Sequence, residues 1–447
     1  MAEYNQPSTL EEVEKNFEQI KPLMNSTEAY YESGRCLFCY DAPCVKACPT
    51  GIDIPLFIKQ INTGNLNGSA KTIYKANYFG NTCGKVCPTE VLCEGACVFN
   101  EQGVKPIDIG RLQSFATTKA MDKDLSLSKA VEKNGKKIAV IGAGPAGISC
   151  ACELSSMGYD VDIYEAKSAP SGLVLHGVAP YKITNEEALK EVEYLQRQFG
   201  FAIKYNSPVT THEQLTDLEE NYSAIFLGIG LGKTASLLIE GEGLTNCIGA
   251  TEFIEQMKLN PLQTFIGKKV IIIGGGNTAM DAASECARLG ADEVILAYRR
   301  SKAEKRAYEF EYDLAKSVGV KGMFNISPVA ILGTEKVEGV RFTKTEVIDG
   351  RVVPVENSEF DISSDMVIRA TGQSKMIELL EQIDGMDLDR KGRILVDPES
   401  FQCKNPKYFA GGDAVNGGAE VVNAAAEAKI AAIGIHNWII GEETLGG

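Results

Sequence analysis

The chain has few histidines and no long apolar run. Only three histidines, His176, His212 and His436, occur in 447 residues, and they lie far apart in the sequence. This scarcity argues against a histidine-rich zinc site and against catalysis by a histidine base. No apolar stretch approaches the roughly 18 residues of a membrane span, and the polar N-terminus does not resemble a signal peptide. We therefore expect a cytoplasmic protein with no membrane association.

The sequence also lacks a basic excess. Lys and Arg total 45 against 60 Asp and Glu, which gives a formal net charge of −15 at pH 7. Nucleic-acid-binding proteins need a basic stripe, and none offsets this charge. An acidic surface is sufficiently explained by solubility. A chain of 447 residues exceeds what one hydrophobic core usually serves, so two or three domains are expected.

Cysteine, in contrast, is abundant and unevenly distributed. Of the 13 cysteines, eight fall between Cys36 and Cys97. Secreted disulfide scaffolds are small, so such a cluster in a long chain without a leader indicates metal or Fe–S ligation in a reducing compartment. The remaining five are expected to be small buried side chains rather than ligands: Cys150, Cys152, Cys247, Cys286 and Cys403.

The spacing of the clustered cysteines favours Fe–S clusters over zinc. They form two runs, Cys36-x2-Cys39-x4-Cys44-x3-Cys48-Pro49 and Cys83-x3-Cys87-Pro88-x4-Cys93-x3-Cys97. Zinc sites favour paired CxxC knuckles around one ion, and only one CxxC is present. Closely spaced thiolates with a terminal Cys-Pro are typical of ferredoxin-like runs that share ligands between two clusters. By spacing alone, the eight cysteines divide into two four-thiolate sites.

Predicted helices surround these cysteines. Residues 8–20 have capping-box signals at Ser8 and Thr9 and apolar residues at helical spacing. Shorter helices are expected near 54–62, 68–76 and 107–119, and residues 121–136 are a polar linker. We therefore predict an α-helical Fe–S domain over residues 1–130.

A glycine motif follows the linker, where a predicted strand (137–141) gives way to a helix (145–157). In Gly142-Ala-Gly144-Pro-Ala-Gly147, the first glycine permits a tight turn, the second lets the backbone approach a pyrophosphate, and the third allows close helix–strand packing. Glu165, after the strand 161–164, can accept ribose hydroxyls. The predicted dinucleotide contacts, for either NAD or FAD, are Gly142, Gly144, Pro145, Ala146, Gly147 and Glu165.

A distant segment favours FAD at this first site. In Tyr408-Phe-Ala-Gly411-Gly412-Asp413, an apolar strand ends in Gly-Gly-Asp, and an Ala-rich helix over 418–437 follows. This arrangement can place Asp413 on a ribityl chain and direct a helix terminus at the isoalloxazine. Gly412 and Asp413 are therefore predicted FAD contacts. The predicted FAD-binding domain is discontinuous, comprising residues 137–232 and 366–447.

A second glycine motif predicts an NAD(P)H-binding domain over residues 233–365. The GxGxxA variant Gly274-Gly-Gly-Asn-Thr-Ala279 separates a strand (270–273) from a helix (277–289) and suits a pyrophosphate. The next strand, 294–298, ends in arginines where an NAD site usually carries an acid, and guanidinium groups suit the 2′-phosphate of NADPH. Two of the three arginines can also be solvated surface charges, so NADH stays open. The predicted contacts are Gly275, Gly276, Asn277, Thr278, Arg299, Arg300 and Arg306.

Together these features predict an α/β two-dinucleotide-binding flavoprotein. It has two Rossmann-like domains and an N-terminal α-helical domain that carries two [4Fe–4S] clusters. NAD(P)H gives up two electrons as a hydride, whereas a cluster carries one at a time, so a flavin is the required converter. Hydride transfer needs aligned rings rather than a protein acid or base, and no catalytic side chain is predicted.

Three segments resemble the N-terminal Fe–S domain of dihydropyrimidine dehydrogenase: RCLFCYDAPCVKACPTGIDI, NYFGNTCGKVCPTEVLCEGACVFN and PIDIGRLQSFAT. The glycine motifs and the Gly-Gly-Asp segment resemble its FAD and NADPH domains. The larger eukaryotic enzyme continues into an FMN barrel and a further Fe–S domain. The resemblance therefore implies the NAD(P)H-oxidising subunit of the two-subunit bacterial enzyme. The small subunit of glutamate synthase is similar in the same way.

The resemblance also implies a set of cluster ligands. It gives one cluster Cys36, Cys39, Cys44 and Cys97, and the other Cys48, Cys87, Cys93 and Gln113. Cys83 is then no ligand, in conflict with the division into two four-thiolate sites. A neutral amide in place of a thiolate makes a cluster less negative and should raise its potential.

Other site residues are implied in the same way. Lys182 matches a basic residue near the FAD, and Arg299 and Arg306 match NADPH contacts, although bacterial relatives often use NADH. Ala370-Thr371-Gly372 matches a loop between the nucleotides, and Gly172-Leu173 matches a Gly-Gly-Leu turn whose first position is Ser171 here. LVLHGVAP, residues 173–180, is more similar to reductases of the adrenodoxin reductase type.

The implied function is that of an electron-input subunit. It oxidises NAD(P)H through FAD and passes electrons through two [4Fe–4S] clusters to an FMN/Fe–S catalytic partner that reduces uracil or thymine. The same module feeding a glutamate synthase is the alternative. A binding or regulatory protein that kept a Rossmann shell without turnover is a third hypothesis. The intact glycine motifs and full ligand set argue against it.

Overall fold

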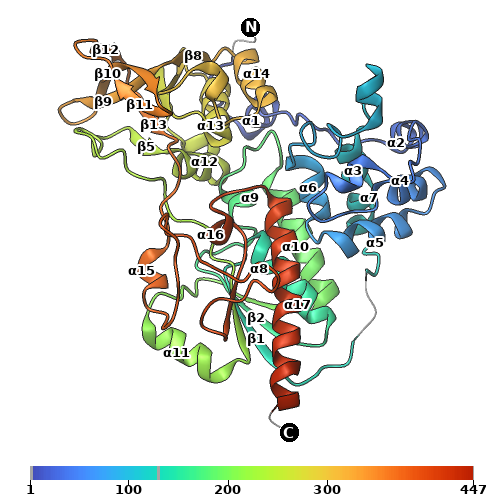
Figure 1. The fold of residues 1–447 in the computed structure, drawn as a ribbon. Helices are drawn as coiled ribbons and strands as arrows, with labels where there is room; N and C mark the ends of the chain where they lie inside the picture. The colour runs from blue at the N-terminus through green and yellow to red at the C-terminus, as the bar shows by residue number, and fades with distance from the viewer. Residues whose placement is uncertain (1–3, 128–130, 446–447) are drawn as a thin grey trace. The chain divides into compact units, whose positions relative to one another are not determined.

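In the computed structural model, residues 4–127 and 131–445 are described, and they form two compact units (Figure 1). The first unit contains residues 1–19, 176–181 and 232–374, and the second contains 20–175, 182–231 and 375–447. The N-terminal segment thus groups with the predicted NAD(P)H-binding region rather than with the cysteines. Its helix α1 (Leu10–Asn16) begins at the Thr9 N-cap, and Val13 and Phe17 pack into the hydrophobic core of the first unit.

The cysteine-bearing part of the second unit is helical. Buried apolar residues such as Phe57, Ile73 and Leu112 form its core. The helices expected near 54–62, 68–76 and 107–119 are confirmed, and two of them begin at side-chain caps, Asp53 and Asn65. The elements are α2 (Ser26–Gly34), α3 (Pro43–Lys46), α4 (Ile54–Asn62), α5 (Leu66–Ala76), α6 (Gly80–Val86), η1 (Val98–Gln102) and α7 (Ile109–Asp122).

The rest of the second unit is built on a five-stranded parallel sheet in the order β14-β4-β1-β2-β3. Its strands are β1 (Lys137–Ile141), β2 (Asp160–Tyr164), β3 (Ala202–Lys204), β4 (Ala224–Leu227) and β14 (Tyr408–Ala410). Because β14 pairs with β4 in parallel, the C-terminal segment completes the first Rossmann-like half, as predicted. The helices are α8 (Pro145–Ser156), α9 (Leu173–His176), α10 (Asn185–Phe199), α11 (His212–Asn221), α15 (Ile377–Leu380), α16 (Asp413–Asn416) and α17 (Val421–Leu445).

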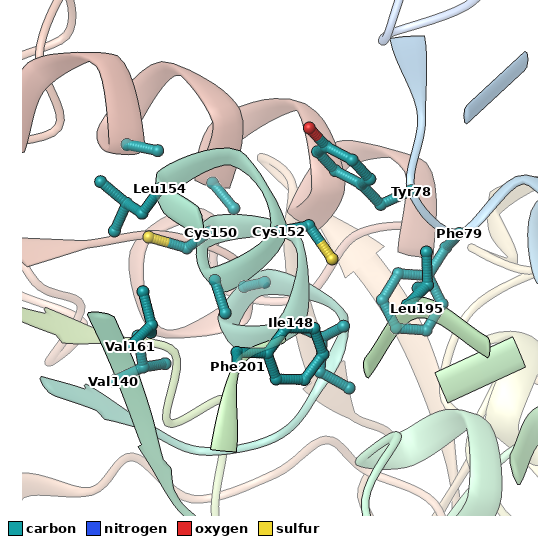
Figure 2. Close-up of a cluster of buried hydrophobic side chains, with 14 of the residues drawn as sticks. Tyr78, Phe79, Val140, Ile148, Cys150, Cys152, Leu154, Val161, Leu195 and Phe201 are labelled. Atoms are coloured by element: carbon teal, nitrogen blue, oxygen red, sulfur yellow. The ribbon is translucent and has the colours of Figure 1, made fainter. Parts of the chain in front are cut away.

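One hydrophobic core joins the cysteine-bearing helices to this sheet. Figure 2 shows Tyr78 and Phe79, which precede α6, in the same cluster as Val140 of β1 and Ile148 of α8. Cys150 and Cys152 on α8 are fully buried in it, which confirms the expectation that they are core residues. The Fe–S part and the first Rossmann-like half are therefore packed as a single body.

A buried carboxylate reinforces this junction. Glu191 on α10 has no exposed surface and accepts hydrogen bonds from the backbone N–H groups of Asn81 (2.6 Å) and Thr82 (2.8 Å). The hydroxyls of Thr82 and Tyr74 donate to it at 2.6 and 3.2 Å. The two N–H groups belong to the first turn of α6, where a helix leaves its donors unsatisfied and favours negative charge. Glu191 therefore supplies the N-terminal acceptor that α6 lacks.

The first unit contains the second Rossmann-like sheet, which is parallel with strand order β5-β13-β6-β7-β8. Its strands are β5 (Cys247–Gly249), β6 (Lys269–Ile273), β7 (Glu293–Tyr298), β8 (Lys321–Phe324) and β13 (Met366–Arg369). The predicted strands at 270–273 and 294–298 and the helix at 277–289 are confirmed to within a residue. The helices are α12 (Ala250–Leu259), η2 (Pro261–Gln263), α13 (Asn277–Arg288), η3 (Lys302–Glu304) and α14 (Glu309–Ser317).

An antiparallel sheet is inserted between β8 and β13. It contains β9 (Ile326–Gly333), β10 (Val337–Ile348), β11 (Arg351–Pro354) and β12 (Phe360–Ser363). Strands β10 and β11 are joined by Asp349 and Gly350, whose φ values are +51° and +75°, and Ile348 pairs with Arg351. An Asp-Gly pair is a strong sequence signal for such a two-residue hairpin. Within the described ranges, no helix is long and apolar enough to cross a membrane.

We expect the substitution Glu191→Gln to destabilise the protein by about 2 to 3 kcal/mol, because the amide NH2 would face donors and leave one or two buried hydrogen bonds unmade. The thermal unfolding midpoint of the holoprotein would measure this loss. Glu193→Gln, a change of the same chemistry at an exposed position of α10, is the matched control. Equal midpoints for the two variants would contradict the role assigned to Glu191.

The same residue should make stability depend on pH. Burial raises the pKa of Glu191 from 4.5 to about 7, although the donors around it act in the opposite direction. The folded protein therefore holds a proton that the unfolded chain releases, and this contribution to stability is lost as the pH rises through about 7. The gap in midpoint between the wild type and Glu191→Gln should narrow from about pH 5 to about pH 8. A gap that widens would exclude this protonation.

Candidate functional site

The first glycine loop has the geometry of a pyrophosphate site. Gly142 has a φ of +99°, and a Cβ there would lie 2.5 Å from the Gly228 carbonyl oxygen. A Cβ on Gly147 would lie 1.9 Å from the Gly142 carbonyl oxygen, so helix α8 approaches the loop as closely as the motif requires. Gly144 is the N-cap of α8, Pro145 opens the helix, and the nearest atom to a Cβ on Gly144 would be 3.9 Å away. The N-terminus of α8 is thus accessible to a phosphate.

Glu165 and the following turn complete this loop. The Glu165 carboxylate is mostly buried and accepts hydrogen bonds from the N–H groups of Ala143 (2.8 Å) and Lys167 (2.7 Å). It is therefore fixed beside the glycine loop, where its remaining lone pairs can accept ribose hydroxyls. Ser171 has a φ of +78° and its N–H donates to the Ala143 carbonyl at 2.7 Å, while Gly172 has a φ of +51°.

The Gly-Gly-Asp segment lies against the start of α8. A Cβ on Gly412, which has a φ of +74°, would lie 3.0 Å from Ala146 Cβ. Burial raises the pKa of Asp413, and its carboxyl oxygen accepts a hydrogen bond from the Ala419 N–H at 3.1 Å. The structure thus brings Gly142, Gly147, Gly412 and the Asp413 backbone to one end of the parallel sheet. Leu173 opens α9 and is partly exposed, whereas Lys182 is buried.

The second glycine loop repeats the design in the first unit. Gly274 has a φ of +156°, and a Cβ there would lie 2.3 Å from the Ala370 carbonyl oxygen. A Cβ on Gly275 would clash with the Tyr298 ring, whereas Gly276, the N-cap of α13, has open space around it. The orientation of the Asn277 side chain is fixed, because its side-chain oxygen accepts a hydrogen bond from the Tyr308 N–H at 3.1 Å.

The arginines after β7 differ in their surroundings. The side chains of Arg299 and Arg306 are exposed, and neither makes a hydrogen bond or ion pair with another described residue. Arg300 instead donates to Glu304. The structure therefore leaves two guanidinium groups available beside the glycine loop rather than three. Residues 370–372 follow β13, and Gly372 has a φ of +105°. Thr278 lies in the first turn of α13.

The cysteines gather around two cavities in the second unit. The first is lined by Cys36, Cys39, Cys44 and Cys97, the ligand set implied for one cluster, with apolar residues such as Ile58 around them. The pKa of Cys44 is raised to about 12, first by burial and then by the neighbouring Cys36 and Cys97, because thiolates repel one another. A cluster supplies the positive charge that holds such buried thiols as thiolates. The donor set therefore fits an Fe–S cluster.

The second cavity is lined by the other implied ligands, Cys48, Cys87, Cys93 and Gln113, and also by Cys83. The Gln113 amide N–H donates to the Gly80 carbonyl at 2.6 Å, which leaves the amide oxygen as the group available to a metal. The neighbouring Cys83 thiol, together with burial, raises the pKa of Cys87. Five candidate donors thus share this cavity. A site for a single metal ion is a different arrangement, and in the described part of the chain no three His, Cys, Asp or Glu side chains form one.

Sequence reasoning missed residues that border the second cavity. Val422, in the first turn of α17, lines it, so the cavity reaches the first Rossmann-like half. Ile54 lines both cavities. Glu191 was missed as well, although a Glu between Ala188 and Val192 on the buried face of α10 is the kind of interruption that marks a buried polar contact.

Comparisons with known proteins agree with this geometry. Residues 13–125 match the family described as dihydropyrimidine dehydrogenase domain II, 4Fe–4S cluster, and residues 136–428 match the pyridine nucleotide-disulphide oxidoreductases. The glutamate synthase [NADPH] small chain of Escherichia coli K12 is 33% identical over 449 residues, which covers 95% of this chain and 94% of that protein. The NAD-dependent dihydropyrimidine dehydrogenase subunit PreT of the same organism is 32% identical over 426 residues, covering 95% and 97%.

Solved structures agree on the fold. FprA of Mycobacterium tuberculosis in complex with NADPH superposes with a TM-score of 0.59 at 19% identity, covering 70% of this chain and 86% of FprA. That likeness concerns the Rossmann-like architecture only. The family matches and the close relatives go further. The chain belongs to the pyridine nucleotide-disulphide oxidoreductases, carries an N-terminal 4Fe–4S domain of the dihydropyrimidine dehydrogenase type, and is an NAD(P)H-dependent FAD and Fe–S oxidoreductase subunit.

Proposed function

We propose that the chain is the electron-input subunit of a dihydropyrimidine dehydrogenase. It takes electrons from NAD(P)H, and a partner subunit with FMN and Fe–S clusters uses them to reduce uracil or thymine to the 5,6-dihydro forms. The likeness to PreT over 97% of that protein supports this proposal, as does the match of the N-terminal part to a dihydropyrimidine dehydrogenase domain. Isolation of the chain with its natural partner from a native lysate tests it directly.

FAD, when bound, would supply the conversion from a two-electron hydride to single electrons, which suits clusters that carry one electron at a time. The chain's own residues bind and orient these groups. Gly144 and Pro145 open α8 toward the pyrophosphate, and Glu165 is fixed to receive a ribose. Asp413 is the residue that would hold the ribityl chain. The cysteines and Gln113 would hold the clusters in cavities whose other lining residues are mostly apolar.

The observation that carries the proposal is the order of the two cavities. The second cavity is bordered by Val422 of the flavin-binding part, whereas the first is lined only by residues between Cys36 and Ile109. The shared Ile54 makes the cavities neighbours. Leu37 and Tyr40, next to cysteines of the first cavity, are exposed. This arrangement supports a path from the flavin side through both cavities to an external acceptor.

A second function is favoured by one specific observation. The glutamate synthase small chain is as similar as PreT, at 33% identity over 94% of its length. In that case the partner is a large amidotransferase subunit rather than an FMN-containing pyrimidine reductase. The size and cofactor content of the co-isolated protein distinguish the two functions.

We also propose NADPH as the preferred nucleotide. The side chains of Arg299 and Arg306 are exposed, make no hydrogen bond or ion pair with another described residue, and lie beside the glycine loop that opens α13. Guanidinium groups bind a 2′-phosphate in two-pronged geometry. The names of the two relatives differ on this point, one being NADPH-dependent and the other NAD-dependent.

The second cluster tests the ligand assignment. We expect Cys83→Ala to keep about eight irons per chain, because the proposed ligands of both clusters are intact, whereas Cys93→Ala should lose about half of them. Iron content and the absorption of anaerobically reconstituted protein measure this. Loss of half the iron in Cys83→Ala would show that Cys83, not Gln113, is the fourth ligand.

The division of labour between subunits gives another expectation. The isolated chain should oxidise NAD(P)H with an artificial dye as acceptor and should leave uracil unchanged, because the described residues supply no second catalytic domain for a pyrimidine. Dye reduction and NAD(P)H consumption with and without uracil measure the two activities. NAD(P)H oxidation that depends on uracil would contradict the assignment of pyrimidine chemistry to a partner.

A further inference from the structure

Arg300 has a different environment from the arginines on either side of it in the nucleotide loop. Its guanidinium donates through Nη1 to Glu304 Oε1 at 3.1 Å and through Nη2 to the Gly350 carbonyl oxygen at 3.0 Å. Gly350 belongs to the turn of the β10–β11 hairpin. A single side chain therefore bridges the loop after β7 to the inserted antiparallel sheet.

The other end of this bridge is also held in place. Glu304 Oε2 accepts hydrogen bonds from the Ser301 N–H at 3.2 Å and the Ser301 hydroxyl at 2.7 Å. The Tyr298 hydroxyl donates to the Glu304 carbonyl oxygen at 3.1 Å. Glu304 is consequently an ordered acceptor, fixed by its own turn, and its carboxylate sets the direction of the Arg300 side chain.

The inserted sheet fixes the main chain of the same loop. The Thr345 hydroxyl of β10 donates to the Arg299 carbonyl oxygen at 3.0 Å, and the Asn325 N–H donates to the Arg300 carbonyl oxygen at 3.0 Å. These bonds leave the Arg299 side chain exposed while its backbone is tied down. The insertion thus anchors the loop at two successive residues.

The glycine loop holds the segment on its opposite side. The Tyr298 ring lies against Gly275, where a Cβ would come within 2.5 Å of it, and the N–H groups of Arg306 and Ala307 both donate to the Gly275 carbonyl oxygen at 2.9 Å. Arg299 directly follows Tyr298. Both exposed arginines are therefore within one residue of a contact with Gly275, in the loop that opens α13.

We propose that Arg300 and Glu304 are positioning residues for nucleotide specificity. They lock the 298–306 loop onto the β10–β11 hairpin, and so preorganise Arg299 and Arg306 to bind the 2′-phosphate of NADPH. Arg300 itself does not contact the nucleotide. This inference rests on the proposed preference for NADPH.

Removal of the Glu304 charge separates this role from direct binding, because the two predict effects of opposite sign. If Arg300 were a phosphate ligand, Glu304 would compete for it, and Glu304→Gln would tighten binding. If Arg300 instead positions the loop, Glu304→Gln loosens the loop and weakens binding of the 2′-phosphate but not of the rest of the nucleotide. Arg300→Lys should behave like Glu304→Gln, because a lysine keeps the charge but cannot bridge two acceptors in fixed geometry.

The test is calorimetric titration of the holoprotein with 2′,5′-ADP and, separately, with ADP, which lacks the 2′-phosphate. We expect Glu304→Gln and Arg300→Lys each to weaken 2′,5′-ADP binding by about 3- to 10-fold, and to leave ADP binding within about 2-fold. The double variant should lose no more than either single variant, since both changes break one network. Asp361→Asn, which breaks the exposed Arg341–Asp361 pair of the same sheet (Nε–Oδ1 2.8 Å), is the matched control and should change neither affinity.

Unchanged or tighter binding of 2′,5′-ADP to Glu304→Gln would overturn the positioning role, as would an equal loss for ADP. The NADPH preference is tested separately by Arg299→Gln combined with Arg306→Gln, which should weaken 2′,5′-ADP binding by about 100-fold. If this double variant binds normally, the proposed 2′-phosphate site fails. If it loses binding while Glu304→Gln does not, only the positioning role fails.

Discussion

A buried carboxyl group at the start of a short helix is the constraint on which the second unit depends. Helix α6 carries Cys83 and leads directly to Cys87, and its first turn has no capping side chain of its own. The acceptor comes instead from Glu191, which lies more than a hundred residues later on α10. The helix that leads to the proposed ligand Cys87 is thus completed only when the flavin-binding part has folded against it. The core that Tyr78 and Phe79 share with α8 also forms only at that stage.

The two nucleotide sites depend on a second constraint, which is the close approach of backbone to backbone. At Gly147 and Gly274 a single added carbon would lie within 2.3 Å of a carbonyl oxygen, so at each position two backbone segments approach more closely than any other residue would allow. At Gly144 and Gly276, by contrast, the space beside the glycine is open. Each motif therefore contains two kinds of glycine. One kind allows close contact between backbone segments, and the other leaves open space in which a ligand can approach the backbone.

The local features of the fold could be predicted from the sequence, whereas its long-range contacts could not. The signals for strands β1, β6 and β7 and for the Asp349-Gly350 hairpin are local, because apolar strand patterns and turn residues involve only a few neighbouring positions. The association of α1 with the first unit depends on the core into which Val13 and Phe17 pack. The apolar periodicity predicts the helix but does not indicate which core it joins. The bridge from Arg300 to Gly350 is equally invisible, because a turn far along the chain supplies the acceptor. At the candidate site, the spacing of the cysteines predicts two groups of ligands, and the structure places the cysteines around two cavities. Cys83 and Gln113 share one cavity, however, and no local pattern distinguishes them as ligands.

The pairing of β14 with β4 has a consequence for how the molecule is made. The edge strand Tyr408–Ala410 and the Gly-Gly-Asp turn that follows it are synthesised after the whole first unit. Until they leave the ribosome, β4 is an unprotected edge whose main-chain groups are open to wrong partners. The cysteine-bearing helices make mostly local contacts and can form early, but the sheet that supports them is complete only after residues 408–410 have been synthesised. The interval between the synthesis of β4 and that of β14 is therefore the period in which this sheet is most open to mispairing.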